Sequence, residues 1–234
     1  MTFRALAACL KCFHIWNHRM SGRAVFMLLL SLLAVFVVWM AVEPHDRADW
    51  MLENALVLLA VVALIVTRRW FVFSNQAYLL IFAFLALHEL GSHYTYSLVP
   101  YDPALRKLFG FSLDQLMGWE RNQFDRLVHL AYGLLLTIPL FEFCRRAVGL
   151  GRGWGYVFAS AIIMATSMLY ELIEWIAAVW FGGDLGQAFL GTQGDIWDAQ
   201  KDMALASIGA VLAVALHVLL QRRSAGADTG APSR

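Results

Sequence analysis

The chain has 234 residues, of which 60% are hydrophobic and 15% are charged, and its formal net charge is +1. Soluble domains carry nearer a quarter charged residues, so this composition excludes an ordinary soluble globular protein and indicates an integral membrane protein. The near-neutral charge, with no basic stripe interleaved with aromatic residues, argues against nucleic acid as a partner.

Residues 1–23 are predicted to form a cytoplasmic or interfacial arm that is amphipathic if helical. Charges and histidines are scattered through this stretch, and no small-residue cleavage site follows a short apolar core, so it is not a typical signal peptide. Cys9 and Cys12 precede His14 and His18 at a spacing that is irregular for zinc. A reduced surface helix is the favoured interpretation here, and a zinc site is the alternative.

Six apolar segments then approach the length of about 20 residues that a membrane-spanning helix needs. The predicted spans are 24–42, 50–67, 75–91, 126–144, 155–181 and 199–220. Between the third and fourth, "PALRKLFGF" and "SLDQLMGWERNQF" predict short interfacial helices. The fold class is therefore all-α: a polytopic membrane protein whose domain, 24–220, is a six-helix transmembrane bundle. The polar tail, 221–234, is predicted to be disordered.

The basic residues predict the orientation of these spans. Short loops rich in Lys and Arg stay cytoplasmic, and the "RR" pairs fall on the same side as the N-terminus when six spans are counted. We therefore predict that both termini are cytoplasmic. Among the acids, only Glu142 and Asp228 fall on that inner side, which leaves the others on the outer side or in the outer half of a span.

Ionisable side chains gather near the outer leaflet at the ends of four consecutive predicted spans. Such residues are expensive inside a bilayer and by default indicate a functional site. Few bases are nearby, so an excess of carboxylates must be protonated or must bind cations. The set comprises His88, Glu89, His93, Asp125, His129, Glu171, Glu174, Asp195, Asp198 and Asp202, with Arg121, Arg126 and Lys201 as the nearby bases.

A divalent metal, as one or two ions, would balance this excess, and ligand pairs at i,i+3 and i,i+4 are how helix bundles build such sites. Mixed carboxylate and imidazole ligands suit zinc, manganese or iron. Three alternatives remain open: each histidine alone can be hydrogen-bonded structure, Asp195 can cap the last span, and Asp198, Lys201 and Asp202 can form a local ion-pair cluster. The predicted ligands are His88, His93, Asp125, His129, Asp195, Asp198 and Asp202.

Three blocks, "LHELGSHYTYSLVPYD", "ERNQFDRLVHLAYG" and "LYELIEWIAAVWFGGDLGQAFLGTQGDIWDAQKDM", resemble the YjdF family of predicted inner-membrane proteins, with similarity over roughly 24–220. The resemblance implies a multi-spanning protein of the bacterial inner (plasma) membrane and brings no established activity. More loosely, the pattern of Glu171, Glu174, Asp198, Asp202 and Gly209 resembles the closing region of VanZ-like membrane proteins, with Ser207 where that pattern has Asn.

These observations lead us to expect a metal-dependent membrane hydrolase or transferase that acts on a membrane lipid or lipid-linked substrate at the outer leaflet, with its site facing the periplasm. The catalytic candidates are Glu171, Glu174 and Glu89, with a desolvated glutamate as general base. Arg121, Arg126 and Lys201 would hold a headgroup phosphate, and the segment 92–124 would form a lid. The alternatives are a proton- or cation-coupled transporter or channel, and a structural protein whose metal site knits the helices together.

Overall fold

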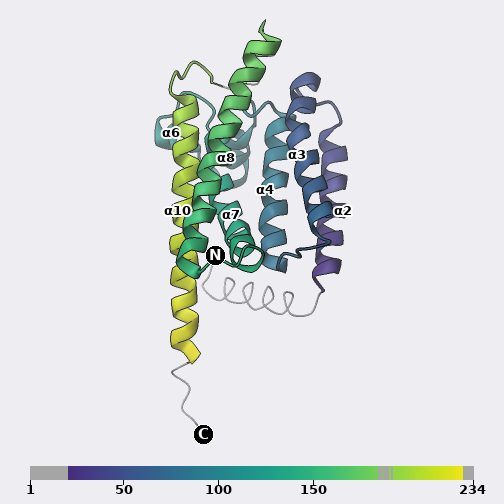
Figure 1. Cartoon of the computed structure of the whole chain (residues 1–234). Helices are drawn as coiled ribbons and strands as arrows, with labels where there is room; N and C mark the ends of the chain where they lie inside the picture. The colour runs from purple at the N-terminus through teal and green to yellow at the C-terminus, as the bar shows by residue number, and fades with distance from the viewer. Residues whose placement is uncertain (1–20, 184–185, 187–189, 191, 229–234) are drawn as a thin grey trace.

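The computed structural model describes residues 21–183, 186, 190 and 192–228, and all regular structure in these residues is helical (Figure 1). Of the predicted arm, 1–23, only residues 21–23 are described. Its cysteine–histidine pattern lies outside the described residues. The helices are α2 (Gly22–Met40), α3 (Arg47–Thr67), α4 (Asn75–His93), α5 (Tyr101–Phe109), α6 (Leu113–Met117), α7 (Phe124–Arg146), α8 (Arg152–Phe181) and α10 (Asp198–Asp228).

Each predicted span coincides with one long helix, and two short helices, α5 and α6, lie in the stretch between the third and fourth. The end of the last helix differs from the prediction. α10 continues past residue 220 to Asp228, into the segment predicted to be disordered. The extension begins with Gln221, Arg222 and Arg223, residue types of high helix propensity. Residues 229–234 lie outside the described part of the chain.

Five of the helices are long and apolar enough to cross a membrane, namely α2, α3, α7, α8 and α10. α4 is also 19 residues long, but its last two turns contain His88, Glu89, Ser92 and His93, which lower its hydropathy. The outward-facing side chains support a lipid environment: Val35, Val38 and Val179 are each about 70% exposed (70%, 68% and 71%) although apolar. Lipid is the medium in which such an exterior costs no free energy.

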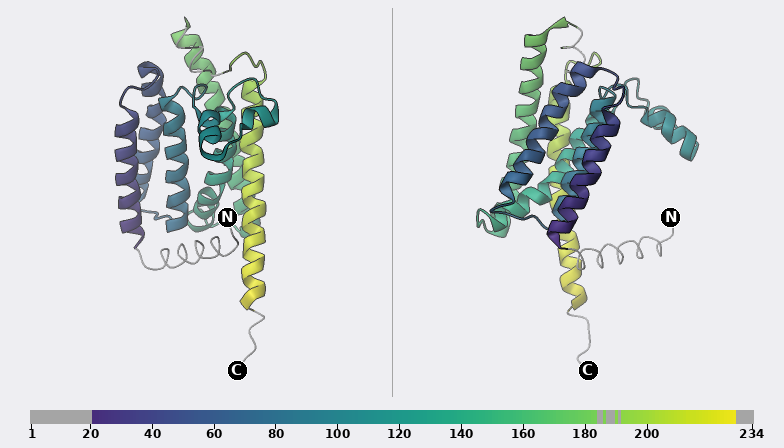
Figure 2. Two further views of the ribbon diagram at one scale, coloured as in Figure 1. Left: turned by 180° about the vertical axis from the view of Figure 1, so that it is seen from behind. Right: turned by 90° about the vertical axis from the view of Figure 1, so that its right-hand side faces the viewer.

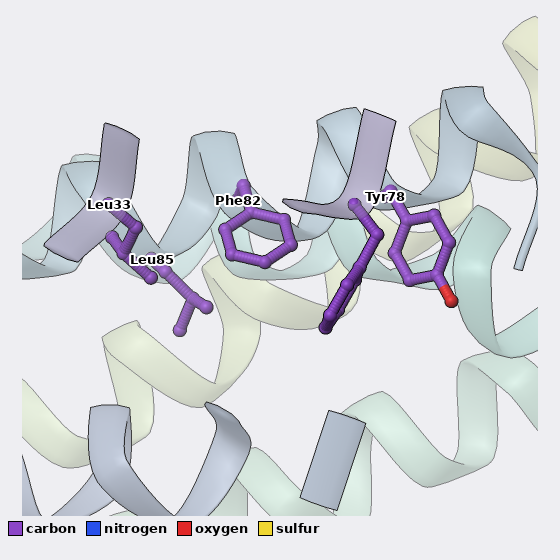
Figure 3. Packing of buried hydrophobic residues seen from close by; sticks show 5 residues of the cluster. Leu33, Tyr78, Phe82 and Leu85 are labelled. Atoms are coloured by element: carbon purple, nitrogen blue, oxygen red, sulfur yellow. The ribbon is translucent and has the colours of Figure 1, made fainter. Parts of the chain in front are cut away.

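α4 and α7 occupy the middle of the bundle (Figures 1 and 2). α4 packs against α2, α3 and α7, whereas α7 packs against α4, α8 and α10. On the α2 side, Phe26 and Leu33 of α2 meet Tyr78, Phe82 and Leu85 of α4 in a buried apolar cluster (Figure 3). This arrangement brings the polar ends of α3, α4, α7, α8 and α10 together at the end of the bundle opposite the start of α2 and the end of α10.

The closest helix contact lies between α7 and α10, where small residues face one another. A Cβ added at Gly133 would overlap the carbonyl oxygen of Ala206, and one at Gly209 would overlap that of Leu130. Small residues at a helix crossing let two backbones approach closely, which is the usual packing device in membranes. Because His129 precedes Gly133 by four residues and Asp202 precedes Ala206 by four, this crossing also sets the distance between those two side chains.

Candidate functional site

The first turns of α7 and α10, with the middle of α8, bring three carboxylates and an imidazole together. Asp125 and His129 lie four residues apart on α7, and the His129 Nε2 is 3.5 Å from the Asp125 Oδ1. The same nitrogen is 3.6 Å from Oε1 of Glu171 on α8. Asp125, His129 and Asp202 each offer one ligand atom, and these atoms lie within 4.8 Å of one another. We call Asp125, His129, Glu171 and Asp202 the acid–histidine cluster.

The acid–histidine cluster is buried and short of hydrogen-bond donors. Asp202 is only 2% exposed, and its Oδ1 has no hydrogen-bond partner. The Glu171 Oε1 is likewise without a hydrogen-bond partner, and the Glu171 side chain is 9% exposed. A buried carboxylate oxygen with no donor costs free energy unless the group is protonated or faces a cation. The cluster therefore has oxygen and nitrogen atoms that can bind a cation, and it has buried carboxylate oxygens with which no protein group pairs.

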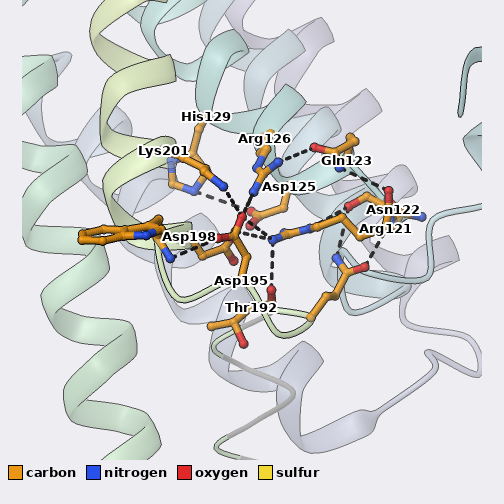
Figure 4. A network of polar contacts seen from close by, with 12 residues as sticks. Arg121, Asn122, Gln123, Asp125, Arg126, His129, Thr192, Asp195, Asp198 and Lys201 are labelled. Atoms are coloured by element: carbon orange, nitrogen blue, oxygen red, sulfur yellow. Dashed lines mark hydrogen bonds and ion pairs between the residues drawn. The ribbon is translucent and has the colours of Figure 1, made fainter. Parts of the chain in front are cut away.

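A second group of charges lies immediately beside the first and has the opposite character (Figure 4). Arg121 Nη1 donates to the Asp198 Oδ1 at 2.5 Å, and Arg126 Nη2 donates to an oxygen of Asp195. Lys201 Nζ reaches the same Asp195 Oδ2 at 2.5 Å. We call Arg121, Arg126, Asp195, Asp198 and Lys201 the arginine cluster. In it three cations meet two carboxylates, so its acids are satisfied without a metal.

The arginine cluster also fixes the segment that leads into α10. Arg121 Nη1 donates to the carbonyl oxygen of Thr192 at 2.9 Å, and the Gln193 side chain exchanges hydrogen bonds with the backbone of Asn122. The hydrogen bond from Lys201, together with one from the Trp197 backbone N–H, lowers the pKa of Asp195 from its ordinary value to about 2. Asp195 is therefore ionised at any physiological pH and serves to hold the α7 and α10 ends together.

Sequence reasoning did not single out α3, yet α3 contributes an acid to the same region. Glu53 is 2% exposed and accepts a hydrogen bond from the Tyr170 hydroxyl of α8 at 3.0 Å. Asp49, one turn earlier, is 1% exposed. The signal was present in the sequence, because Glu53 is a carboxylate inside a predicted span just as Glu171 is.

His88 of α4 faces Glu53 and lies outside the acid–histidine cluster. Its Nε2 donates to the Glu53 carbonyl oxygen at 3.3 Å, so in the neutral ring Nδ1 must accept, and it receives the Tyr96 hydroxyl at 2.5 Å. Burial raises the pKa of Tyr96, which keeps that hydroxyl protonated and able to donate. Both imidazole nitrogens are thus engaged by protein atoms.

The structure does not bring the remaining predicted residues to the acid–histidine cluster, with one exception. Glu89 points toward α3, where its Oε1 accepts from the Trp50 indole at 3.0 Å. His93 donates from Nδ1 to the Met40 carbonyl at 2.7 Å and so fastens the end of α2. Glu174, the exception, is buried on α8 and interacts electrostatically with Glu171 and Asp125. Glu89 and His93 therefore do not belong to the candidate site, because their side chains contact α3 and α2 instead.

A cavity of about 640 Å³ extends from this polar end into the bundle between α3, α4, α7 and α8. Its polar lining includes His88, Tyr96, Asp125, His129 and Tyr170. Most of its other lining residues are apolar. The acid–histidine cluster is therefore reached from inside the bundle through its Asp125 and His129 faces.

The fold and the site together define a class: a helical membrane protein with carboxylates and imidazoles buried between its helices at one end. The chain belongs to the family described as "Predicted membrane protein (DUF2238)", whose sequence profile matches residues 25–223. It is 33% identical over 183 residues to the inner membrane protein YjdF of Escherichia coli strain K12. The matched region covers 78% of this chain and 83% of YjdF. This confirms the predicted family. No solved structure matches the chain significantly.

Proposed function

We propose that the protein is a membrane-embedded, metal-dependent hydrolase or transferase that acts on a lipid-linked substrate. The observation that carries this proposal is the group of Asp125, His129 and Asp202, in which one oxygen of the buried Asp202 has no hydrogen-bond partner. Three protein ligands of mixed oxygen and nitrogen type leave a coordination position free, as catalytic sites do and closed structural sites do not.

The donor set favours zinc, manganese or iron, because two carboxylates and one imidazole suit these ions better than soft ones. One such group occurs among the described residues, so we propose one ion. A bound ion of this kind lowers the pKa of its water to about 7 and polarises a phosphoryl or acyl oxygen. Glu171, whose Oε1 lies 3.6 Å from the His129 Nε2, would complete the coordination of the ion or would serve as the general base.

The role of the three predicted phosphate-binding cations is narrower than the sequence implied. Arg121, Arg126 and Lys201 already bind Asp195 and Asp198, so a headgroup would have to share them. Two guanidinium nitrogens, the Arg121 Nη2 and the Arg126 Nε, are buried without a hydrogen-bond partner. These donors support a phosphate contact at the edge of the cluster, because an arginine fork binds phosphate bidentately.

For the membrane arrangement we propose six spans, with α4 as the sixth and both termini cytoplasmic. α4 packs in the middle of the bundle alongside the five apolar helices, a position that lies within the bilayer if its neighbours cross it. The end opposite the acid–histidine cluster carries the basic residues that favour the cytoplasmic side, Arg68, Arg69, Arg145, Arg146, Arg152 and Arg222. The site then faces the periplasm, and α5 and α6 lie at the outer interface.

A proton relay is the second candidate, and one observation favours it. Polar groups connect α3 to α7 by way of α8, through Glu53, Tyr170, Glu174, Glu171 and His129. Chains of this kind move protons in pumps. The lining of the cavity toward the other end of the bundle is mostly apolar, however, and does not continue the chain across the membrane.

Metal content measured by inductively coupled plasma mass spectrometry tests the proposal directly. The gently purified wild type should contain about one ion per chain, and Asp125→Asn/Asp202→Asn should contain none. Asp195→Asn is the matched control, because Asp195 is an acid at the same end that is already paired with Arg126 and Lys201. A folded, metal-free wild type would overturn the proposal, and proton flux in liposomes would then test the relay.

A further inference from the structure

The cavity beside the acid–histidine cluster is at least as long as one leaflet of a bilayer is deep. Its lining runs along α3 from Leu56 to Thr67, which is about 16 Å at 1.5 Å per residue. Along α7 it runs from Asp125 to Phe143, about 27 Å by the same measure. The hydrocarbon core of a bilayer is about 30 Å thick, so one acyl chain occupies about 15 Å of depth.

The chemistry of the lining changes along that length. The end near the acid–histidine cluster presents imidazole, carboxylate and phenol groups, whereas the rest is formed by side chains such as Leu64, Phe84, Leu136 and Phe143. Among the hydroxyls in the apolar part, Thr67 and Thr166 each donate to a carbonyl of their own helix at 2.6 Å, whereas the buried Ser167 hydroxyl has no hydrogen-bond partner. A ligand that fits this lining has a polar head at one end and a plain hydrocarbon chain behind it.

The cavity opens sideways, toward the surroundings of the bundle, between α3 and α8. α3 packs mainly on α4, and α8 packs on α7 and α10, so these two helices flank the cavity rather than close it. Figure 1 shows α3 and α8 on the near side of the bundle, with α4 and α7 behind them. Leu169 and Ile173 of α8 line the cavity and yet are 51% and 50% exposed. At the polar end, the Tyr170 hydroxyl bridges the opening to Glu53.

We propose that this cavity holds one acyl chain of a membrane glycerophospholipid, which enters laterally between α3 and α8 and brings its ester and phosphate groups to the acid–histidine cluster. The reaction of the lipid rests on the proposed function, whereas its binding in the cavity does not. It names the substrate class: a lipid that reaches the site from within the bilayer.

Three features of the molecule select this occupant. Cavities of about 300–1,000 Å³ hold a single small ligand, so 640 Å³ suits one chain and not a whole two-chain lipid. The opening lies between two helices that are long and apolar enough to cross a membrane, so within a bilayer it would meet acyl chains. The polar head of such a lipid would lie at the end of the cavity that Asp125, His129 and Tyr170 line.

Photolabelling of the full-length protein in vesicles tests the proposal. The probe is a phosphatidylethanolamine with a diazirine in one acyl chain, diluted into phosphatidylethanolamine and phosphatidylglycerol, and the adducts are mapped by mass spectrometry. Ala60→Phe fills the cavity from α3, because Ala60 lines it. Ala55→Phe is the matched control, since Ala55 is an exposed residue of the same helix that does not line the cavity.

We expect adducts on Leu136 and Leu140, which line the cavity from α7. Ala60→Phe should reduce them about tenfold, whereas Ala55→Phe should leave them unchanged. Adducts confined to outward residues such as Val62 and Leu172, or inner adducts equal in both variants, would overturn the proposal. Inner labelling by a diazirine polyprenyl phosphate, with none by the phospholipid, would overturn the acyl-chain assignment.

The same experiment separates this inference from the proposed function. Asp125→Asn/Asp202→Asn should lose the metal but keep the inner adducts, because the apolar part of the cavity is untouched. If the wild type contains no metal and yet shows adducts that Ala60→Phe removes, lipid binding stands and the metal-dependent activity falls. If metal is bound and no inner adduct forms, the lipid inference falls by itself.

Discussion

The arginine cluster and the acid–histidine cluster are neighbours at the same end of α7 and α10, yet they neutralise their charges differently. In the first, Arg121 and Arg126 meet Asp198 and Asp195 within hydrogen-bonding distance. In the second, three carboxylates share one imidazole, and one oxygen of Asp202 has no hydrogen-bond partner. In the first cluster every carboxylate is paired with a cation, and these pairs hold the ends of the helices together. The second is complete only with protons or a cation, which is why we assign the chemistry to it.

The largest expected effect comes from the crossing on which both clusters depend. Gly133→Val places methyl groups against the Ala206 backbone and should force α7 and α10 apart. We expect a loss of more than about 4 kcal/mol of stability, or failure to accumulate in the membrane, because backbone atoms cannot move aside as side chains can. Thermal unfolding followed by tryptophan fluorescence measures it. Gly153→Val is the control, since a Cβ at Gly153 meets nothing within 4 Å.

Removing one partner from the arginine cluster should have the next largest effect. Arg121→Met leaves Asp198, whose side chain is 5% exposed, without its closest cation. Arg126 Nη2 still lies 3.4 Å from the Asp198 Oδ1, so the loss should stay below about 3 kcal/mol, the cost of an uncompensated buried charge. The double variant Arg121→Met/Asp198→Leu should recover most of that loss. A single variant as stable as the wild type would show that the pair does not hold the two helix ends together.

In the acid–histidine cluster, the sign of the effect should depend on metal. Without metal, Asp202→Asn should leave the protein as stable as the wild type or more so, because it removes one of several crowded carboxylates. With metal at about 100 times its dissociation constant, the wild type should gain about 2.7 kcal/mol that the variant lacks. Unfolding with zinc or manganese and with a chelator measures both arms. Equal shifts in the two proteins would show that Asp202 is not a ligand.

The smallest expected effect concerns the exposed edge of the arginine cluster. Lys201 is 47% exposed, so Lys201→Ala should lower the free energy of unfolding by about 0.2–1 kcal/mol, and by less in high salt.

Asp195, the acid that pairs with Lys201, allows a test by pH. Because the folded-state pKa of Asp195 is lowered to about 2, its contribution is present above its ordinary value of 3.8 and is lost as the pH falls through about 2.

The difference in apparent melting temperature between the wild type and Asp195→Asn measures this contribution. It should therefore be constant from pH 7 to about pH 4 and shrink below that. A difference that already vanishes at pH 5 would contradict the strong pairing of Asp195 with Lys201 and Arg126.

The sequence by itself determined the membrane class, the family and the positions of the long helices. Those properties are local: an apolar run of sufficient length must satisfy its backbone as a helix in lipid, whatever its neighbours are. The bounds of the last helix differ from the prediction, because α10 continues past the apolar run to Asp228.

Only the tertiary structure decided which acids are paired and which are not. The spacing of Asp195, Asp198 and Asp202 places them near one face of a helix, but it does not say what faces them. Arg126 of α7 pairs with Asp195, and Arg121 of the segment before α7 pairs with Asp198. The close approach of α7 and α10 at Gly133 brings His129 near Asp202. Glu53 likewise lies close to these residues because this side of α3 faces α8, where Tyr170 donates a hydrogen bond to it. These pairings depend on how separate helices are turned toward one another, which no local pattern in the chain specifies.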